Sequence, residues 1–228
     1  DAFGKKQKYE AEYNRLLNSN AALKAKYGGV LEDLNANVIK SNDYVKIREY
    51  SLEILRTNIE MLRYYSKLDA LVNAFEKNGG EEMMKKADAV KSWGPGYFKN
   101  YERKIDEETF AALLQMYYND VDKDYIFKGL ESLAPNSDQY TANVKALFDA
   151  SYLNSEEKLN ELLIKKPEDL ANSIKSDPAY IFYKEMIDQY NVKVAPNVTL
   201  YEGKVTSGME RYMAAQMEVF KDRKFYPD

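Results

Sequence analysis

The stretch that decides the fold is YFKNYERKIDEETFAALLQMYYNDV, Tyr97–Val121. Asp106 has the chemistry of a helix N-cap, because its side chain can accept a hydrogen bond from an amide of the first turn. Glu107 and Glu108 would then lie in that first turn, where the helix dipole favours negative charge. These three carboxylates are therefore expected to start a helix rather than to form a catalytic pair.

The residues around this cap continue the helical pattern. Ile105 and Phe110 have the spacing of a hydrophobic staple. Apolar side chains then recur at positions 110, 113, 114, 117, 118 and 121, which form one face of an α-helix. We expect this face to lie in the core.

Composition limits the class of protein. The chain has 228 residues, of which 45% are hydrophobic and 31% charged, enough for a sizeable core in one large domain or two small ones. Its net charge of -4 gives no indication of the basic face that nucleic-acid binding requires. No apolar run approaches the roughly 18 residues that span a bilayer, so we expect no membrane span.

The chain contains no histidine and no cysteine. A Ser-His-Asp or Cys-His triad cannot form within it, nor can the Glu-x-x-His motif of di-iron bundles. Zinc sites almost always use these residues, and no EF-hand-type loop is present. We therefore expect no catalytic residue, metal or cofactor, and no disulfide. Ser151, Ser173 and Ser207 have no histidine base.

The pattern is helical almost throughout and predicts an all-α fold. The first helix is expected over about 5–27, closed by Gly28 and Gly29 in the left-handed conformation. A shorter helix follows from Val30 to Val38. The KSND segment (40–43) either caps the next helix or is passed without a break.

The longest helix is expected over about 44–77. Positions 47, 51, 54, 58, 61, 65, 68, 72 and 75 alternate steps of four and three, with Ser51 and Asn58 as the two non-apolar members. This seam is typical of a helix packed lengthwise on its neighbours. About 34 residues would extend on the order of 50 Å, which predicts an elongated multi-helix bundle.

The second half divides into shorter helices. KNGG (77–80) is expected to end the long helix, and WGPGYF (93–98) to be the clearest break. Later helices are expected near 138–150, 155–165, 168–175, 178–191 and 198–222. Asn154 and Glu157 resemble a capping box, Pro167 and Pro178 fit first helical turns, and NVKVAPNVTL (191–200) is compatible with a brief extended segment.

The 20 tyrosines are compatible with a binding face or with the wet edge of a core. Their positions on helix faces favour the core edge, with one ring of each pair 64–65 and 117–118 inside. Met209, Met213 and Met217 lie four apart and are expected to pack in the core rather than to form a binding stripe. Asn197-Val198-Thr199 matches a glycosylation acceptor, a pattern that often arises by chance.

YFKNYERKIDEETFAALLQMYY (97–118) also resembles a segment of the bacterial dipeptidyl-peptidases of the seven and eleven type. The likeness extends in order to YEAEYNRLL (9–17), LFDASYLNSEEKL (147–159), DPAYIFYKEM (177–186) and MAAQMEVFKDRKFYPD (213–228). In that family a helical domain is inserted into a chymotrypsin-like double β-barrel and covers its Ser-His-Asp site. The resemblance implies that residues 1–228 are most of this single helical cap domain, with ends cut from a longer peptidase.

Further expectations follow from the resemblance. The parent would release dipeptides from free peptide N-termini in the periplasm, or at the cell surface, of a Gram-negative bacterium. A homodimer of the parent is compatible with the resemblance. The cap's partners would be the β-barrel domain and the peptide substrate. The family's amine-anchoring asparagine falls upstream of the first helix, so no substrate-binding residue is assigned. The alternative is a stand-alone helical scaffold that binds a protein partner through its tyrosines.

Overall fold

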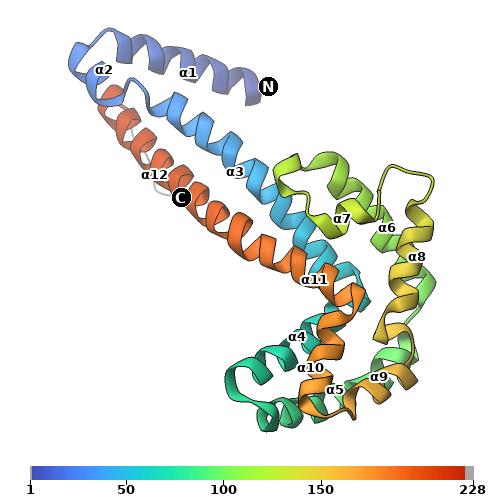
Figure 1. Ribbon diagram of the computed structural model, residues 1–228. Coiled ribbons are helices and arrows are strands. Elements are labelled where there is room, and N and C mark those ends of the chain that lie inside the picture. Colours follow the sequence, from blue (N-terminus) through green and yellow to red (C-terminus); the bar gives the residue numbers. More distant parts are fainter. Residues whose placement is uncertain (1, 224–228) are drawn as a thin grey trace. The chain divides into compact units, whose positions relative to one another are not determined.

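Every regular element in the computed structural model, which describes residues 2–223, is helical, and this part of the chain contains no strand. The all-α prediction is therefore confirmed. The α-helices (Figure 1) are α1 (Ala2–Asn18), α2 (Ala21–Tyr27), α3 (Val30–Leu52), α4 (Glu60–Asn78), α5 (Gly80–Asn100), α6 (Arg103–Asp120), α7 (Lys128–Ser132), α8 (Tyr140–Ala150), α9 (Glu156–Leu163), α10 (Pro167–Ser176), α11 (Pro178–Gln189) and α12 (Ala195–Val219). Two π-helical segments cover Glu53–Asn58 and Tyr190–Val194, and two 3₁₀ turns cover Lys123–Tyr125 and Tyr152–Asn154.

The chain forms two compact units. One contains the residues up to Val45 together with those from Ala195 onward. Here α1, α2 and α12 pack side by side (Figure 1). Their buried core consists of Tyr13, Leu17, Tyr27, Val30, Ala215 and Phe220. The half-buried Tyr212 packs against this core and meets Tyr13 edge-on, with the ring centroids 5.2 Å apart.

The other unit is Lys46–Val194. Its central helix α4 packs against α5, α10 and α11. A second layer joins α6, α8 and α11 through a cluster of aromatic rings. Phe110 lies 5.4 Å from Phe148 and 5.2 Å from Phe182, measured between ring centroids. Such tilted and edge-to-face pairs stabilise a core beyond their buried area.

The predicted cap of α6 is wrong. The helix begins at Arg103 after Glu102, and Asp106 lies inside its first turns with only 4% of its surface exposed. Ile105 is 64% exposed, so the hydrophobic staple does not form. The predicted core face is confirmed: Phe110, Leu114, Tyr117 and Val121 are buried, and positions 113 and 118 are half-buried.

The uninterrupted helix over 44–77 is also wrong. The chain passes 40–43 without a break, the second of the two alternatives, but α3 ends at Leu52 and turns into the π-helical segment. Ile59 is extended, at φ -101° and ψ 103°, before α4 begins. Asn58, one of the two non-apolar positions of the predicted seam, lies beside this break. Its side chain is exposed to solvent, as is usual for asparagine.

The first helix divides at Ser19. Asn20 caps α2 by accepting hydrogen bonds from the backbone N–H groups of Ala22 and Leu23, at 3.0 and 3.1 Å. Gly28 follows the end of α2, as predicted, but its φ of -56° is right-handed. The left-handed glycine is Gly79 (φ 84°) between α4 and α5, which confirms the predicted end at KNGG.

The predicted break at WGPGYF is wrong, because α5 continues through Pro95 to Asn100. A proline inside a helix removes one backbone hydrogen bond. Here α5 also packs against α9: Gly94 is buried, and a Cβ at that position would lie 3.5 Å from Leu159. The chain leaves the helix at Tyr101 and Glu102, which are both extended.

Among the later helices, the predicted capping box is displaced by one residue. Ser155, not Asn154, caps α9 by accepting from the Lys158 N–H at 3.2 Å. Pro167 and Pro178 lie in first turns, as predicted. The segment 191–200 is helical rather than extended, and α12 ends at Val219. The end of the last matching segment, residues 224–228, lies outside the described part of the chain.

Two expectations about side chains are also wrong. Tyr64 and Tyr65 are both buried, so this pair does not divide between core and surface, whereas Tyr117 is buried and Tyr118 half-buried. The methionine stripe on α12 is exposed rather than packed. Met209, Met213 and Met217 expose 60%, 49% and 52% of their surface.

Candidate functional site

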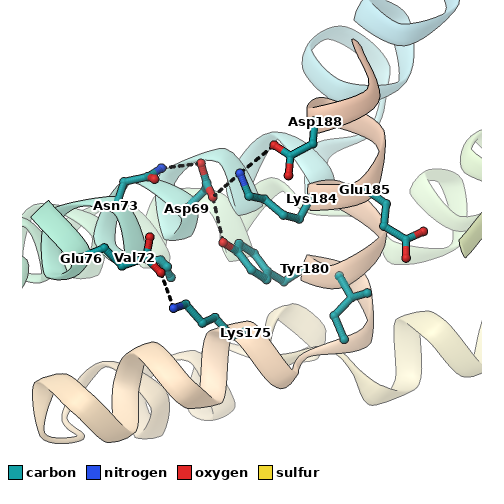
Figure 2. A pocket seen from close by; sticks show the side chains of 10 residues that line it. Asp69, Val72, Asn73, Glu76, Lys175, Tyr180, Lys184, Glu185 and Asp188 are labelled. Carbon is teal, nitrogen blue, oxygen red and sulfur yellow. Dashed lines mark hydrogen bonds and ion pairs between the residues drawn. The ribbon is translucent and has the colours of Figure 1, made fainter. Parts of the chain in front are cut away.

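Charged side chains from three helices meet in a pocket of about 350 Å³ between α4, α10 and α11 (Figure 2). We call it the Asp69 pocket. Its lining residues are Asp69, Val72, Asn73, Glu76, Lys175, Tyr180, Ile181, Lys184, Glu185 and Asp188. All of them belong to the unit Lys46–Val194.

Helical spacing explains how this sequence builds the pocket. Asp69, Asn73 and Glu76 follow each other at steps of four and three, so they lie on one face of α4. Tyr180 and Lys184 follow the same rule on α11. The buried Asp177 fixes the start of α11, because one of its oxygens accepts hydrogen bonds from the backbone N–H groups of Ala179 and Tyr180, at 2.8 and 3.2 Å.

Asp69 is the centre of the polar network (Figure 2). Its carboxylate accepts hydrogen bonds from the Tyr180 hydroxyl and from the Asn73 amide, both at 2.8 Å, and the Lys184 Nζ lies 3.9 Å away. Burial, together with the hydrogen bond to Asp69, raises the pKa of Tyr180 well above its usual range. The phenol therefore remains a protonated donor.

The other carboxylates of the pocket are also occupied. Glu76 pairs with Lys175, whose hydrogen bond lowers the pKa of Glu76. Asp188 accepts from the Lys184 Nζ at 2.8 Å, which raises the pKa of Lys184. Glu185 points away from this network (Figure 2) and accepts from the Gly129 backbone N–H at 2.7 Å.

This arrangement defines what the pocket can do chemically. Each carboxylate of the pocket already accepts a hydrogen bond, and nothing in the geometry singles out one of them as a general base. Four carboxylates against two lysine amines leave an excess of negative charge, which suits a small cationic or hydrogen-bonding ligand. No metal site is indicated, because no group of three or more carboxylates within residues 2–223 is placed to hold an ion.

The serines considered from the sequence are not brought together. Ser151 is fully buried, lies 2.7 Å from the Tyr65 hydroxyl and accepts from the Leu153 N–H at 2.9 Å. Ser173 accepts from the Lys165 Nζ at 2.8 Å. Ser207 is exposed on α12. Because the chain has no histidine, none of them belongs to a Ser-His arrangement, and Ser173 is the acceptor rather than the donor in its contact with Lys165.

The three carboxylates of the opening stretch are structural. Glu107 and Glu108 pair with Arg103 and Lys104 one turn earlier, at 3.3 and 3.9 Å. Asp106 accepts hydrogen bonds from two backbone N–H groups of α4. The sequence did not predict the Asp69 pocket. The only available signal was the polar spacing on α4, which does not reveal its partners on α10 and α11.

The family model described as Peptidase S46 matches residues 1–228. The chain belongs to the peptidase S46 family. This confirms the resemblance found in the sequence. Within residues 2–223 of this S46 chain, no helix is both long and apolar enough to cross a bilayer.

Two curated relatives carry the name Asp/Glu-specific dipeptidyl-peptidase. The one from Flavobacterium psychrophilum is 24% identical over 229 aligned residues, covering 100% of this chain and 31% of the relative. The one from Capnocytophaga gingivalis is 22% identical, covering 98% of this chain and 31% of the relative. The S46 chain thus spans about 31% of the length of these relatives.

A solved structure has a similar fold. DPP11 of Porphyromonas endodontalis, determined in complex with the dipeptide Arg-Glu, superposes with a TM-score of 0.60 at 17% identity. The match covers 93% of the S46 chain and 30% of that structure. At this identity the likeness establishes the fold alone.

Proposed function

We propose that this S46 chain is the helical cap domain of a serine dipeptidyl-peptidase that releases dipeptides from peptide N-termini. The observation that carries the proposal is the family match over residues 1–228 of a chain that spans only 31% of its curated relatives. In this proposal both compact units belong to one domain. The names of the relatives support a preference of the parent enzyme for Asp or Glu.

The catalytic residues would lie elsewhere in the parent polypeptide. The absence of histidine prevents a Ser-His-Asp triad within this chain, and the carboxylates of the Asp69 pocket are engaged with lysine, tyrosine and backbone partners. A helical cap would restrict the cleft to chain ends and exclude water around the bound peptide. A periplasmic or cell-surface location is part of the same proposal.

The test compares the 228-residue chain with the parent polypeptide. Both are incubated with peptides that carry a free or an acetylated N-terminus and an acidic residue in second position. The parent is expected to release dipeptides from the free N-terminus only, whereas the chain alone is expected to release none. Dipeptide release by the chain alone would overturn the cap assignment, and a parent that releases none from these acidic peptides would overturn the preference for Asp or Glu.

The exposed methionine stripe supports the alternative of a protein-binding scaffold, because Met side chains adapt to varied partners. Peroxide oxidation of Met209, Met213 and Met217, followed by mass spectrometry, distinguishes the two. In the cap proposal these residues oxidise more slowly in the parent than in the chain alone. Equal rates in both, with protection only in a self-associated chain, would favour the scaffold.

A further inference from the structure

A second cleft lies between α4 and α5, with a volume of about 290 Å³. We call it the Trp93 cleft. It is lined by Glu60, Arg63, Tyr64, Lys67, Trp93, Gly96, Tyr97 and Asn100. A cleft of this size suits a small ligand.

Two cations dominate its α4 side. Arg63 and Lys67 are four residues apart, so their positive charges face each other along the helix and repel. The nearest carboxylate to Arg63 is that of Glu60, at 3.9 Å. No ion pair with Lys67 forms within the described part of the chain, and its ammonium instead lies 3.4 Å from the ring centroid of Trp93. An anion in this cleft would relieve the repulsion.

Burial and the neighbouring Arg63 charge both lower the pKa of Lys67. This direction agrees with the geometry, because both effects disfavour a second positive charge where no anion compensates for it. The Lys67 Nζ lies against the face of the Trp93 ring, a position in which an ammonium group is attracted by the aromatic electrons.

The α5 side supplies an aromatic wall. Trp93 is the only tryptophan of the chain and is 48% exposed, so part of its ring is accessible from the cleft. Tyr97 continues the wall, with its ring 4.8 Å from that of Tyr64. Flat aromatic surfaces of this kind can stack on planar peptide groups. The amide of Asn100 lies at the same cleft.

Glu60 restricts which anion fits. Its carboxylate repels a compact dianion such as phosphate, but can accept a hydrogen bond from an N–H or amine group. The cleft therefore offers cations for a carboxylate, an acceptor for a peptide nitrogen and an aromatic wall for the group between them.

We propose that the Trp93 cleft binds the carboxylate of a short acidic peptide, with Arg63 and Lys67 as its cationic partners. The proposal goes beyond the cap function and does not depend on it, because binding is measured without turnover. Trp93 is both a wall of the site and its reporter.

The experiment titrates the 228-residue chain with the dipeptide Ala-Glu and follows tryptophan fluorescence, which reports on Trp93 alone. Calorimetry under the same conditions measures binding independently of the fluorophore. A saturable response that weakens with added salt is expected. The peptide Ala-Gln amide, which keeps the N-terminal amine but has no carboxylate, and inorganic phosphate are titrated in parallel, and both are expected to bind more weakly.

Variants assign the response to the cleft. Arg63→Gln and Lys67→Gln are each expected to weaken Ala-Glu binding roughly tenfold, since each removes a charged hydrogen-bond donor. Lys67→Arg is expected to retain binding. Lys128→Gln, which removes an exposed charge on α7, is the matched control and should bind as the unaltered chain does. Circular dichroism verifies that each variant keeps its helices.

Several outcomes would overturn the proposal. If Ala-Glu produces no fluorescence change and no calorimetric heat, the site is excluded. Equal binding of Ala-Gln amide would exclude carboxylate recognition, and tighter binding of phosphate would exclude the peptide class. If Arg63→Gln and Lys67→Gln both bind like the Lys128→Gln control, the ligand binds elsewhere. Failure of the peptidase assay leaves all these readouts unaffected.

Discussion

Asp106, in the first turns of α6, accepts a hydrogen bond of 2.7 Å from the backbone N–H of Glu60, the first residue of α4. Its second oxygen accepts from the Met61 N–H at 3.0 Å. Ile59, which occupies the N-cap position of α4, provides no side-chain hydrogen bond. Asp106 thus caps a helix that begins 46 residues earlier in the chain, and it joins α6 to α4.

Replacing Asp106 should therefore destabilise the fold. Asp106→Ala leaves two N–H groups without acceptors near a buried position, and we expect a loss of about 3 kcal/mol in the free energy of unfolding. Asp106→Asn keeps one acceptor oxygen and should lose less. Urea unfolding followed by circular dichroism measures both. Glu108→Ala, on the exposed side of the same helix, is the control, and a similar loss there would contradict the assignment.

Asp106 should also make stability depend on pH. Burial raises its pKa above the usual value, outweighing the hydrogen bonds from Met61 and Glu60, which lower it. Between the unfolded and the raised pKa, the folded state binds more protons than the unfolded state. The contribution of Asp106 is therefore most favourable below this window and declines as pH rises through it.

Asp106→Asn cannot titrate, so comparison with it isolates this contribution. Unfolding free energies are measured for both proteins from roughly pH 3 to pH 7. The stability advantage of the unaltered chain over Asp106→Asn is expected to shrink as pH rises through the window. An advantage that grows with pH would mean that hydrogen bonding, rather than burial, controls this carboxyl.

The case of Asp106 also shows how far sequence reasoning extends. The pattern correctly placed Phe110 in the core. It also recognised that the Asp106 carboxylate can cap a helix, which it does for α4. It assigned the cap to the wrong helix, because local spacing cannot distinguish the amides of α6 from those of α4. The break at Ile59 was missed for the same reason, since the residue that caps α4 lies far along the chain.

The Asp69 pocket could likewise be predicted only in part from the sequence. The apolar seam on α4 predicted that Tyr65 and Leu68 are buried, because periodicity reports which face of a helix is covered. It could not predict that Asp69 meets Tyr180, which lies 111 residues later. Polar pairs between helices depend on how the helices pack, and a single sequence carries no direct signal for that. Exposure of the methionines on α12 was unpredictable because an apolar stripe looks the same whether covered or not.

Two buried tyrosines test the cost of an unpaired hydroxyl. The Tyr65 hydroxyl lies 2.7 Å from Ser151 Oγ, with both side chains buried. The Tyr13 hydroxyl is also buried, and it has no hydrogen-bond partner within the described residues. Removing a paired hydroxyl loses a hydrogen bond, whereas removing an unpaired one relieves a desolvation cost.

We therefore expect Tyr65→Phe to destabilise the chain by about 1 kcal/mol. Tyr13→Phe should be neutral or slightly stabilising. Both substitutions keep the aromatic ring, so each controls for packing in the other, and chemical denaturation measures the difference. Equal losses for the two variants would show that the Tyr13 hydroxyl does have a partner.

Two glycines of α5 test the helix through the WGPGYF stretch. Gly96 is exposed, and a Cβ there would meet no atom within 4 Å. In a helix interior, alanine is favoured over glycine by up to about 1 kcal/mol. Gly96→Ala should therefore raise the midpoint of thermal unfolding, which would not follow if this stretch were the loop that its sequence suggests.

Gly80, at the start of the same helix, should respond in the opposite direction. A Cβ there would lie 2.8 Å from both Cβ and Cγ of Pro167, and the rigid proline ring at the start of α10 cannot move aside as a flexible side chain would. Gly80→Ala is expected to destabilise the chain by roughly 1–3 kcal/mol. Thermal unfolding of both variants, monitored by circular dichroism in the same buffer, measures how far each substitution shifts the unfolding midpoint. A rise in the midpoint for Gly80→Ala would show that α5 and α10 do not approach as closely as the structure places them.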